Sequence, residues 1–132
     1  MIVVVHVALG GVAGALAKSR GAAVLLGALT HLVADVCPHE DIDSRPFEIA
    51  SGVIAVAALA SRYGSLDPVT IGAAAAAAPD LEHVLPTPRP GGKQLFPSHR
   101  WQPKSRPARV PVKIQLIAAS LLLAGLLFRR SR

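Results

Sequence analysis

Long apolar runs alternate with short polar breaks along the chain, and this pattern predicts helices. The runs cover residues 2–17, 21–37, 47–61, 69–85 and 110–128. None has the strict apolar–polar alternation of a half-buried strand, and each is long enough for several helical turns. Asp67-Pro68 predicts the start of the fourth helix, because aspartate caps helix N-termini and proline suits the first turn. We therefore expect one all-α domain over 1–132, a bundle of four to five short helices.

The composition favours a membrane environment for this bundle. Of 132 residues, 52% are apolar and only 17% are charged, and the mean hydropathy is +0.46. Nearly charge-free helices in so small a chain leave little polar surface for water. Most runs are short for a hydrocarbon layer about 30 Å thick, because about 16 residues rise only about 24 Å. We expect the run 110–128, closed by the basic tail 129–132, to be a C-terminal membrane helix of an integral membrane protein.

A basic stretch precedes this last run. Residues 86–111 are rich in Pro, Gly, Lys and Arg, and so predict a long irregular loop. The whole chain carries 14 Lys and Arg against 8 Asp and Glu, a net charge of +6. Loop cations can hold a substrate phosphate or contact lipid headgroups, and the sequence leaves both readings open. We expect no nucleic-acid partner, because Phe96 and Trp101 are the loop's only aromatic residues and single strands are bound by stacking series.

Polar residues within the runs occupy positions that an antiparallel bundle brings to one end. If the helices alternate in direction, the start of the first and the ends of the second and fourth share one face. All five histidines and seven of the eight acids then gather there. His6 lies on one helical stripe with Gly10 and Gly14, and His31 lies on one with Asp35. These stripes should face inward, because a lipid-facing Asp35 near the bilayer centre would cost about 2.5–3.5 kcal/mol.

The spacing of these residues suits metal binding. His31 and Asp35 stand at i, i+4 and Asp80 and His83 at i, i+3, so each pair lies on one helical face. Asp80 also joins a stripe with Gly72 and Ala76 if the fourth helix continues through Pro79. A mixed set of imidazole and carboxylate ligands suits Zn²⁺, and also Mn²⁺ or Fe²⁺. The predicted metal ligands are His6, His31, Asp35, Asp80, His83 and His99.

Two more residues are candidates for a catalytic role. Glu82 is a candidate general base or a partner that orients a ligand, with an ordinary surface charge as the alternative. Arg100, or a loop lysine, is the candidate to hold a phosphate. Divalent ions lower the pKa of a bound water and stabilise charge on phosphorus. The pattern therefore predicts a membrane-embedded metal-dependent hydrolase of a phosphoester.

Three segments carry a resemblance to a known family. They are Gly27–Asp35 (GALTHLVAD), Ala78–His83 (APDLEH) and Phe96–Arg100 (FPSHR). Together they resemble the LexA-regulated inner-membrane metal-dependent hydrolases of bacteria, also described as domain of unknown function 457 and distantly similar to zinc-dependent phospholipase C. The resemblance covers roughly residues 1–105. It implies a multi-helix protein of the inner membrane with a His/Asp metal site and a lipid-like phosphoester substrate.

The resemblance assigns metal binding to the same six residues, motif by motif. His6 matches the early helical histidine, while the H-x-x-x-D pair, the P-D-x-[DE]-H element and the His-Arg element supply the other five. Family members often follow His-Arg with a second histidine, whereas this chain has Trp101-Gln102-Pro103-Lys104-Ser105.

That departure supports an alternative, a non-catalytic accessory subunit of a larger membrane complex with a structural or vestigial site. Gly10, Gly14 and the alanine run 73–78 would then pack against partner helices. A histidine-ligated haem or pigment is a third reading of the same residues.

Overall fold

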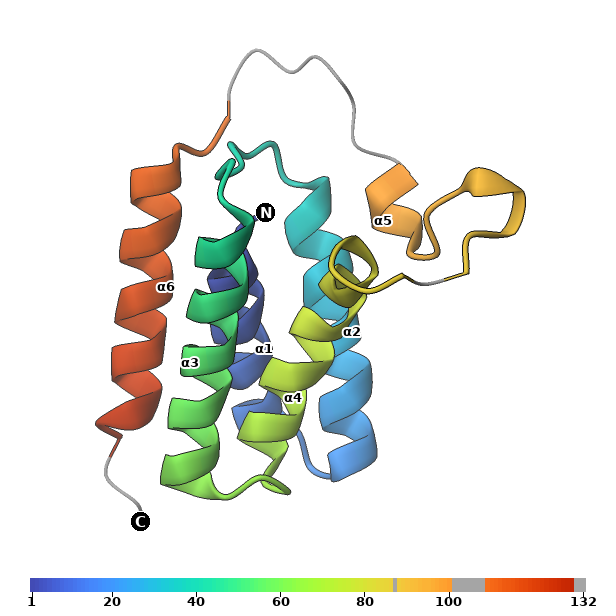
Figure 1. Cartoon of the computed structure of the whole chain (residues 1–132). Coiled ribbons are helices and arrows are strands. Elements are labelled where there is room, and N and C mark those ends of the chain that lie inside the picture. The colour runs from blue at the N-terminus through green and yellow to red at the C-terminus, as the bar shows by residue number, and fades with distance from the viewer. Residues whose placement is uncertain (87, 101–108, 130–132) are drawn as a thin grey trace.

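The chain folds into an all-α bundle whose long helices alternate in direction. The computed structural model describes residues 1–86, 88–100 and 109–129. Five helices run up and down the bundle, and one-turn α5 and two 3-10 turns lie at the end that holds the N-terminus (Figure 1). In chain order the elements are α1 (Val3–Leu16), α2 (Arg20–Val36), α3 (Arg45–Tyr63), α4 (Pro68–Ala77), η1 (Ala78–His83), η2 (Pro90–Gly92), α5 (Pro97–Arg100) and α6 (Val112–Leu127).

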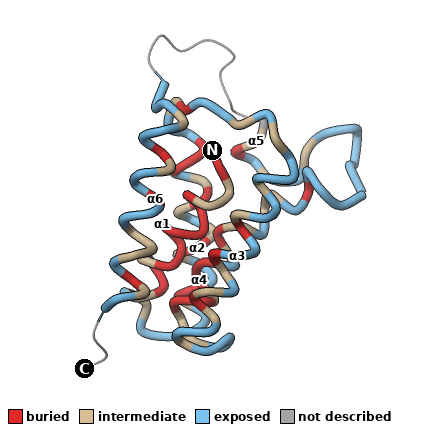
Figure 2. Tube along the Cα trace, turned by 60° about the vertical axis from the view of Figure 1, so that its left-hand side comes forward, coloured by how far each residue is buried: buried red, intermediate tan, exposed pale blue. Residues whose placement is uncertain are grey.

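Helix α1 is the centre of the bundle. It packs most extensively against α4 and also contacts α2, α6 and α3. Buried positions accordingly follow α1 and the facing side of α4, while the outer sides of the surrounding helices are exposed (Figure 2). One core cluster joins Val7 of α1 to Leu59 of α3 and Ala73 of α4, and a second joins Ile2 and Val5 to Ala119 of α6. A helix that is apolar on all sides fits this central position.

Glycine lets α1 and α4 approach closely. A Cβ atom on Gly10 would lie 2.4 Å from the carbonyl oxygen of Gly72, and one on Gly14 would lie 2.1 Å from that of Pro68. A Cβ on Gly72 would lie 2.4 Å from the Gly10 carbonyl oxygen in return. Gly10 and Gly14, which the sequence offered to partner helices, therefore contact the chain's own α4.

The start of α4 was predicted correctly and its end was not. Asp67 caps the helix, its carboxylate accepting a hydrogen bond of 2.8 Å from the Val69 amide, and Pro68 begins the first turn. The predicted stripe through Asp80 required the α-helix to continue through Pro79. Instead the α-helix ends at Ala77, and the chain continues as the tighter 3-10 turn η1. Proline lacks an N–H and its ring clashes with the preceding turn, so the chain changes its hydrogen-bonding pattern there.

The predicted C-terminal membrane helix is shorter than expected. Helix α6 covers 16 residues, Val112–Leu127, because Pro111 precedes its first turn and the helix ends at Phe128. Within residues 1–86, 88–100 and 109–129, no helix has the length and apolar character needed to cross a membrane. The prediction that 110–128 spans the bilayer is thus not supported.

The stretch 86–111 is not wholly irregular, because it contains η2 and α5. Its end pairs with the α2–α3 connection: the Glu40 amide donates to the Val110 carbonyl at 3.1 Å, and the Val110 amide donates to the Pro38 carbonyl at 2.9 Å. This pairing fixes the start of α6 beside the polar end of the bundle. The cations Lys104 and Arg106 lie outside the described residues.

Candidate metal centre

The six residues predicted as ligands come together at one end of the bundle. Three overlapping triads form, and in each triad one donor atom per residue lies within 4.8 Å of the others. The antiparallel order of α1, α2 and α4 produces this meeting, because it places the start of α1 beside the ends of the other two (Figure 1). The triads are His6/His31/Asp80, His31/Asp35/His99 and Asp80/His83/His99.

Asp35, near the end of α2, is the centre of this polar cluster. Its Oδ1 lies 3.2 Å from His6 Nε2, and its Oδ2 lies 3.0 Å from His31 Nε2 and 3.4 Å from His99 Nε2. The Ser98 hydroxyl, which is 1% exposed, donates a further hydrogen bond of 2.8 Å to Oδ2. A buried carboxylate needs such partners, because removing its charge from water is costly. The cluster therefore holds Asp35 as an anion at its centre.

The orientation of His31 is fixed by the backbone of α4. Its Nδ1 lies 2.8 Å from the Ala76 carbonyl oxygen, and since a carbonyl only accepts, Nδ1 carries the proton. In a 3-10 pattern this carbonyl would pair with the nitrogen of Pro79, which has no hydrogen to donate. His31 Nε2 then faces Asp35 Oδ2 at 3.0 Å and His99 Nε2 at 3.2 Å. Ligating histidines in metalloproteins are oriented by such a hydrogen bond on the second nitrogen.

Glu82 fixes His99 and is itself buried, only 4% exposed. Its Oε2 accepts a hydrogen bond of 2.6 Å from the Leu95 amide, and its Oε1 accepts one of 3.3 Å from the Phe96 amide. His99 Nδ1 donates to the same Oε1, so His99 Nε2 faces Asp35 at 3.4 Å and Asp80 at 3.6 Å. With both of its oxygens engaged, Glu82 is neither a surface charge nor a free base, but the partner that orients a histidine.

The carboxylates around His99 change its charge state. Burial by itself lowers the pKa of His99, but hydrogen bonds to Asp35, Asp80 and Glu82 outweigh burial and raise the pKa to about 10. Burial also raises the pKa of Glu82, but its hydrogen bonds from His99, Leu95 and Phe96 reverse this and lower it. Without another cation in the cluster, a protonated His99 balances part of its negative charge.

Two side chains of the cluster keep unused polar atoms. Asp80 Oδ2 lies 3.9 Å from His6 Nε2 and 4.0 Å from His31 Nδ1, beyond hydrogen-bond length. Among the described residues, this oxygen and His6 Nδ1 are buried without a hydrogen-bond partner, and His6 Nε2 lies 3.2 Å from Asp35 Oδ1 without the alignment of a hydrogen bond. His6 is 0% exposed and stacks on His31 with ring centroids 4.1 Å apart. Buried polar atoms are rarely left unpaired, and a metal ion is one way to satisfy them.

His83 lies at the outer edge of the cluster. It is an exposed residue of η1, and its ring packs against that of His99 with centroids 4.4 Å apart. The nearby loop cation Arg89 donates to the Glu82 carbonyl oxygen at 3.0 Å. Arg100 is in α5, but its side chain lies outside the described part of the structure, so its predicted phosphate contact is not tested.

A cleft of about 920 Å³ opens onto this cluster. Asp35, Asp80, His83 and His99 line its inner end, and α3 and α4 form its walls. Four of the six candidate ligands therefore line a cleft that a small molecule can enter.

Three contributors to the site escaped the sequence analysis. Ser98 lies inside the FPSHR segment, and its position next to His99 in the sequence was the signal that could have placed it in the site. The Ala76 carbonyl gave none, because the sequence does not show which backbone group a fold leaves free. Glu48 of α3 lines the cleft and accepts a hydrogen bond of 2.7 Å from the Val3 amide, and its position at the start of α3 pointed only to a helix cap. No protein-family model, curated protein or solved structure matches this chain.

Proposed function

We propose that this protein is a metal-dependent hydrolase that cleaves a phosphoester at a membrane surface. The observation that carries the proposal is the meeting of four histidines and two aspartates from α1, α2, η1 and α5 in three overlapping triads. A single buried histidine is an ordinary core residue, whereas six donors from four elements are the composition of a metal site.

The residues present fit a divalent ion. The ring nitrogens of His6 and the Oδ2 atom of Asp80 make no aligned hydrogen bond in the fold, so they are available as metal ligands. His31 and His99 each present one ring nitrogen to the cluster while a partner binds the other. Mixed nitrogen and oxygen donors suit Zn²⁺, with Mn²⁺ or Fe²⁺ as the other choices. The proposed ligands are His6, His31, Asp35, Asp80, His83 and His99.

Bound ions would supply a water of lowered pKa and a positive field for the charge that develops on phosphorus. The chain's own part is to hold the donors still and to admit substrate. Asp35 is held by Ser98, and His99 by Glu82. Such outer partners typically contribute about 10–100-fold in metal affinity or activity. His83 is the exposed member of the cluster and also lines the cleft, so it can contact substrate there.

Exposed apolar side chains support the membrane part of the proposal. Leu25 and Val33 on the outer side of α2 are 61% and 63% exposed, and Leu121 on α6 is 69% exposed. Large exposed apolar areas on one domain are typical of surfaces that contact lipid or other proteins. The resemblance to inner-membrane hydrolases favours lipid. Flotation with vesicles of mixed neutral and anionic lipid tests this part alone.

The same exposed side chains also support the second candidate, an accessory subunit of a larger membrane complex. Its exposed apolar residues on α2 and α6 would then pack against unrelated subunits. Native mass measurement after gentle extraction discriminates the two. A stoichiometric complex with unrelated subunits favours the accessory role, and an isolated monomer or homodimer favours the hydrolase.

Metal analysis tests the hydrolase directly. We expect purified protein to bind Zn²⁺ or Mn²⁺ and to hydrolyse bis-p-nitrophenyl phosphate, and we expect His31→Ala and Asp35→Ala to lose both properties. His39→Ala is the matched control, because His39 is buried at the same end but hydrogen-bonds the Cys37 carbonyl and joins none of the triads. Metal content that neither His31→Ala nor Asp35→Ala changes, in variants that remain helical, would end the proposal.

A further inference from the structure

The cleft beside the candidate metal centre extends well beyond it. Its walls continue along α3 from Glu48 to Ala57 and along α4 from Ala74 to Ala77. The α3 part alone rises about 14 Å, at about 1.5 Å per residue. A water molecule and a phosphate need only the inner end, so most of the cleft is left for another part of a ligand.

The two ends of the cleft differ in chemistry. Five acidic side chains line the end at the His/Asp cluster, while Val53, Val56, Ala57 and Ala74 line the other end. A ligand that matches this gradient has a charged head and an apolar body. The inner acids are Asp35, Asp41, Asp43, Glu48 and Asp80. The Met1 amino group, which lies 3.4 Å from Asp35 and 3.3 Å from Asp41, and Arg45 also line the cleft and offset part of this negative charge. A metal ion at the His/Asp cluster would offset more of it, so that the head can be anionic.

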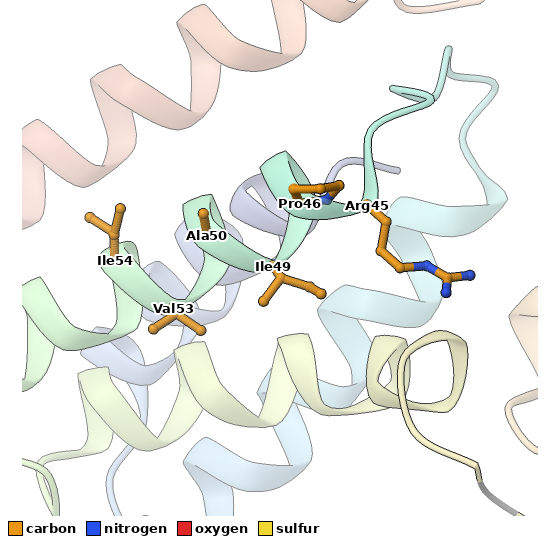
Figure 3. Close-up of a pocket in the computed structure, with 6 residues that line it drawn as sticks. All are labelled: Arg45, Pro46, Ile49, Ala50, Val53 and Ile54. Carbon is orange, nitrogen blue, oxygen red and sulfur yellow. The ribbon is translucent and has the colours of Figure 1, made fainter.

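The apolar wall also continues onto the outside of the bundle. Arg45, Ile49 and Val53 line both the cleft and a shallow hollow of about 480 Å³ on the outer face of α3. In Figure 3, Ile49 and Val53 project to the α4 side of α3, and Ala50 and Ile54 project to the other side. Val53 is 63% exposed and Ile54 is 67% exposed. A hydrocarbon chain could thus pass from a lipid layer into the cleft along Ile49 and Val53, with Arg45 beside them at the polar end of the same wall.

We propose that the α3–α4 cleft binds the hydrocarbon chain of a single-chain amphiphilic phosphoester, with its phosphate at the His/Asp cluster. This inference rests on the proposed hydrolase function and names its substrate class. The exposed alanines Ala57 and Ala74 set the width of the apolar end, since their small side chains leave the space between the two helices open.

Alkylphosphonates of increasing length test the inference, because their carbon–phosphorus bond is not a hydrolase substrate and binding can be measured alone. Calorimetry of zinc-loaded protein in amphipol, with butyl-, hexyl- and octylphosphonate, should show affinity rising about threefold to fourfold per methylene, the gain expected for a buried CH₂. Equal affinity for all three lengths would overturn the proposal.

Two substitutions locate the chain. Ala57→Trp and Ala74→Trp fill the apolar end and should abolish the dependence on length while butylphosphonate still binds. Ala118→Trp, at an exposed alanine of α6 away from the cleft, is the matched control and should leave the series unchanged. An unchanged series in both cleft variants would place the chain elsewhere and refute the proposal.

The two proposals fail in different ways. If the protein binds no metal, the hydrolase function fails, and phosphonates of every length should bind poorly against the acidic inner end. If metal binds and bis-p-nitrophenyl phosphate is cleaved but chain length has no effect, only the substrate class is wrong. Tighter binding of octylammonium than of octylphosphonate to the zinc-loaded protein would also overturn the anionic head.

Discussion

Replacing Gly72 by alanine should separate the two central helices and weaken the site that they carry. The new Cβ would lie 2.4 Å from the Gly10 carbonyl oxygen and 2.9 Å from Gly14 Cα. Ordinary van der Waals contact begins near 3.4 Å, so α1 and α4 must move apart by about 1 Å. Backbone cannot rotate out of the way as a flexible side chain can.

The expected loss of stability follows from two opposing effects. Overpacking a tight contact costs about 1–3 kcal/mol, and alanine recovers up to about 1 kcal/mol of helix propensity over glycine. Taking the upper part of the first range, we expect a net loss of about 2 kcal/mol. For a chain of this size that lowers Tm by roughly 5–10 °C. His6 Nε2 on α1 and Asp80 Oδ2 beyond α4, which lie 3.9 Å apart, would also separate further. We expect this to reduce zinc affinity by about 10–100-fold, the effect seen when a ligand loses the partner that orients it.

Thermal unfolding followed by far-ultraviolet circular dichroism measures the first effect, and a competitive zinc titration measures the second. Gly125→Ala is the control, because Gly125 is helical and its added Cβ would meet nothing within 4 Å among the described residues. That variant should melt at or slightly above the native temperature. A Gly72→Ala protein as stable as Gly125→Ala would refute the reasoning from close approach.

Three further outcomes are expected. Glu82→Gln should lower zinc affinity about 10–100-fold in a competitive titration, because the neutral amide holds its histidine less well, whereas Glu40→Gln should not. Leu59→Ala should lower the free energy of urea unfolding by about 2–5 kcal/mol, because Leu59 is 0% exposed in the core; a loss below that range would mean that the core collapses around the cavity. The hydrogen bond from His39 is the main reason that the pKa of Asp41 falls to about 2, despite partial burial. The stabilising effect of the ionised Asp41 is therefore present above about pH 4 and lost as the pH falls toward 2. The difference in unfolding free energy between native protein and Asp41→Asn should shrink over that range. A constant difference would contradict this role of Asp41.

The sequence by itself determined the helices and the composition of the site. Apolar runs located the five long helices, and Asp67-Pro68 located the start of α4, because capping and periodicity are local properties of the chain. The six candidate ligands were also predictable. Short connections force neighbouring helices to alternate, so His6, the end of α2 and the segment after α4 had to share one end.

Only the tertiary structure decided how those residues are oriented. The carbonyl of Ala76 becomes a partner of His31 because Pro79 ends the α-helix, a consequence that the expected continuous stripe concealed. Glu82 is buried because the segment 95–99 folds back over η1, and no local pattern distinguishes it from a surface charge. The α3–α4 cleft likewise depends on how two distant helices pack, since a cavity is a property of the space between segments and has no signature in either one.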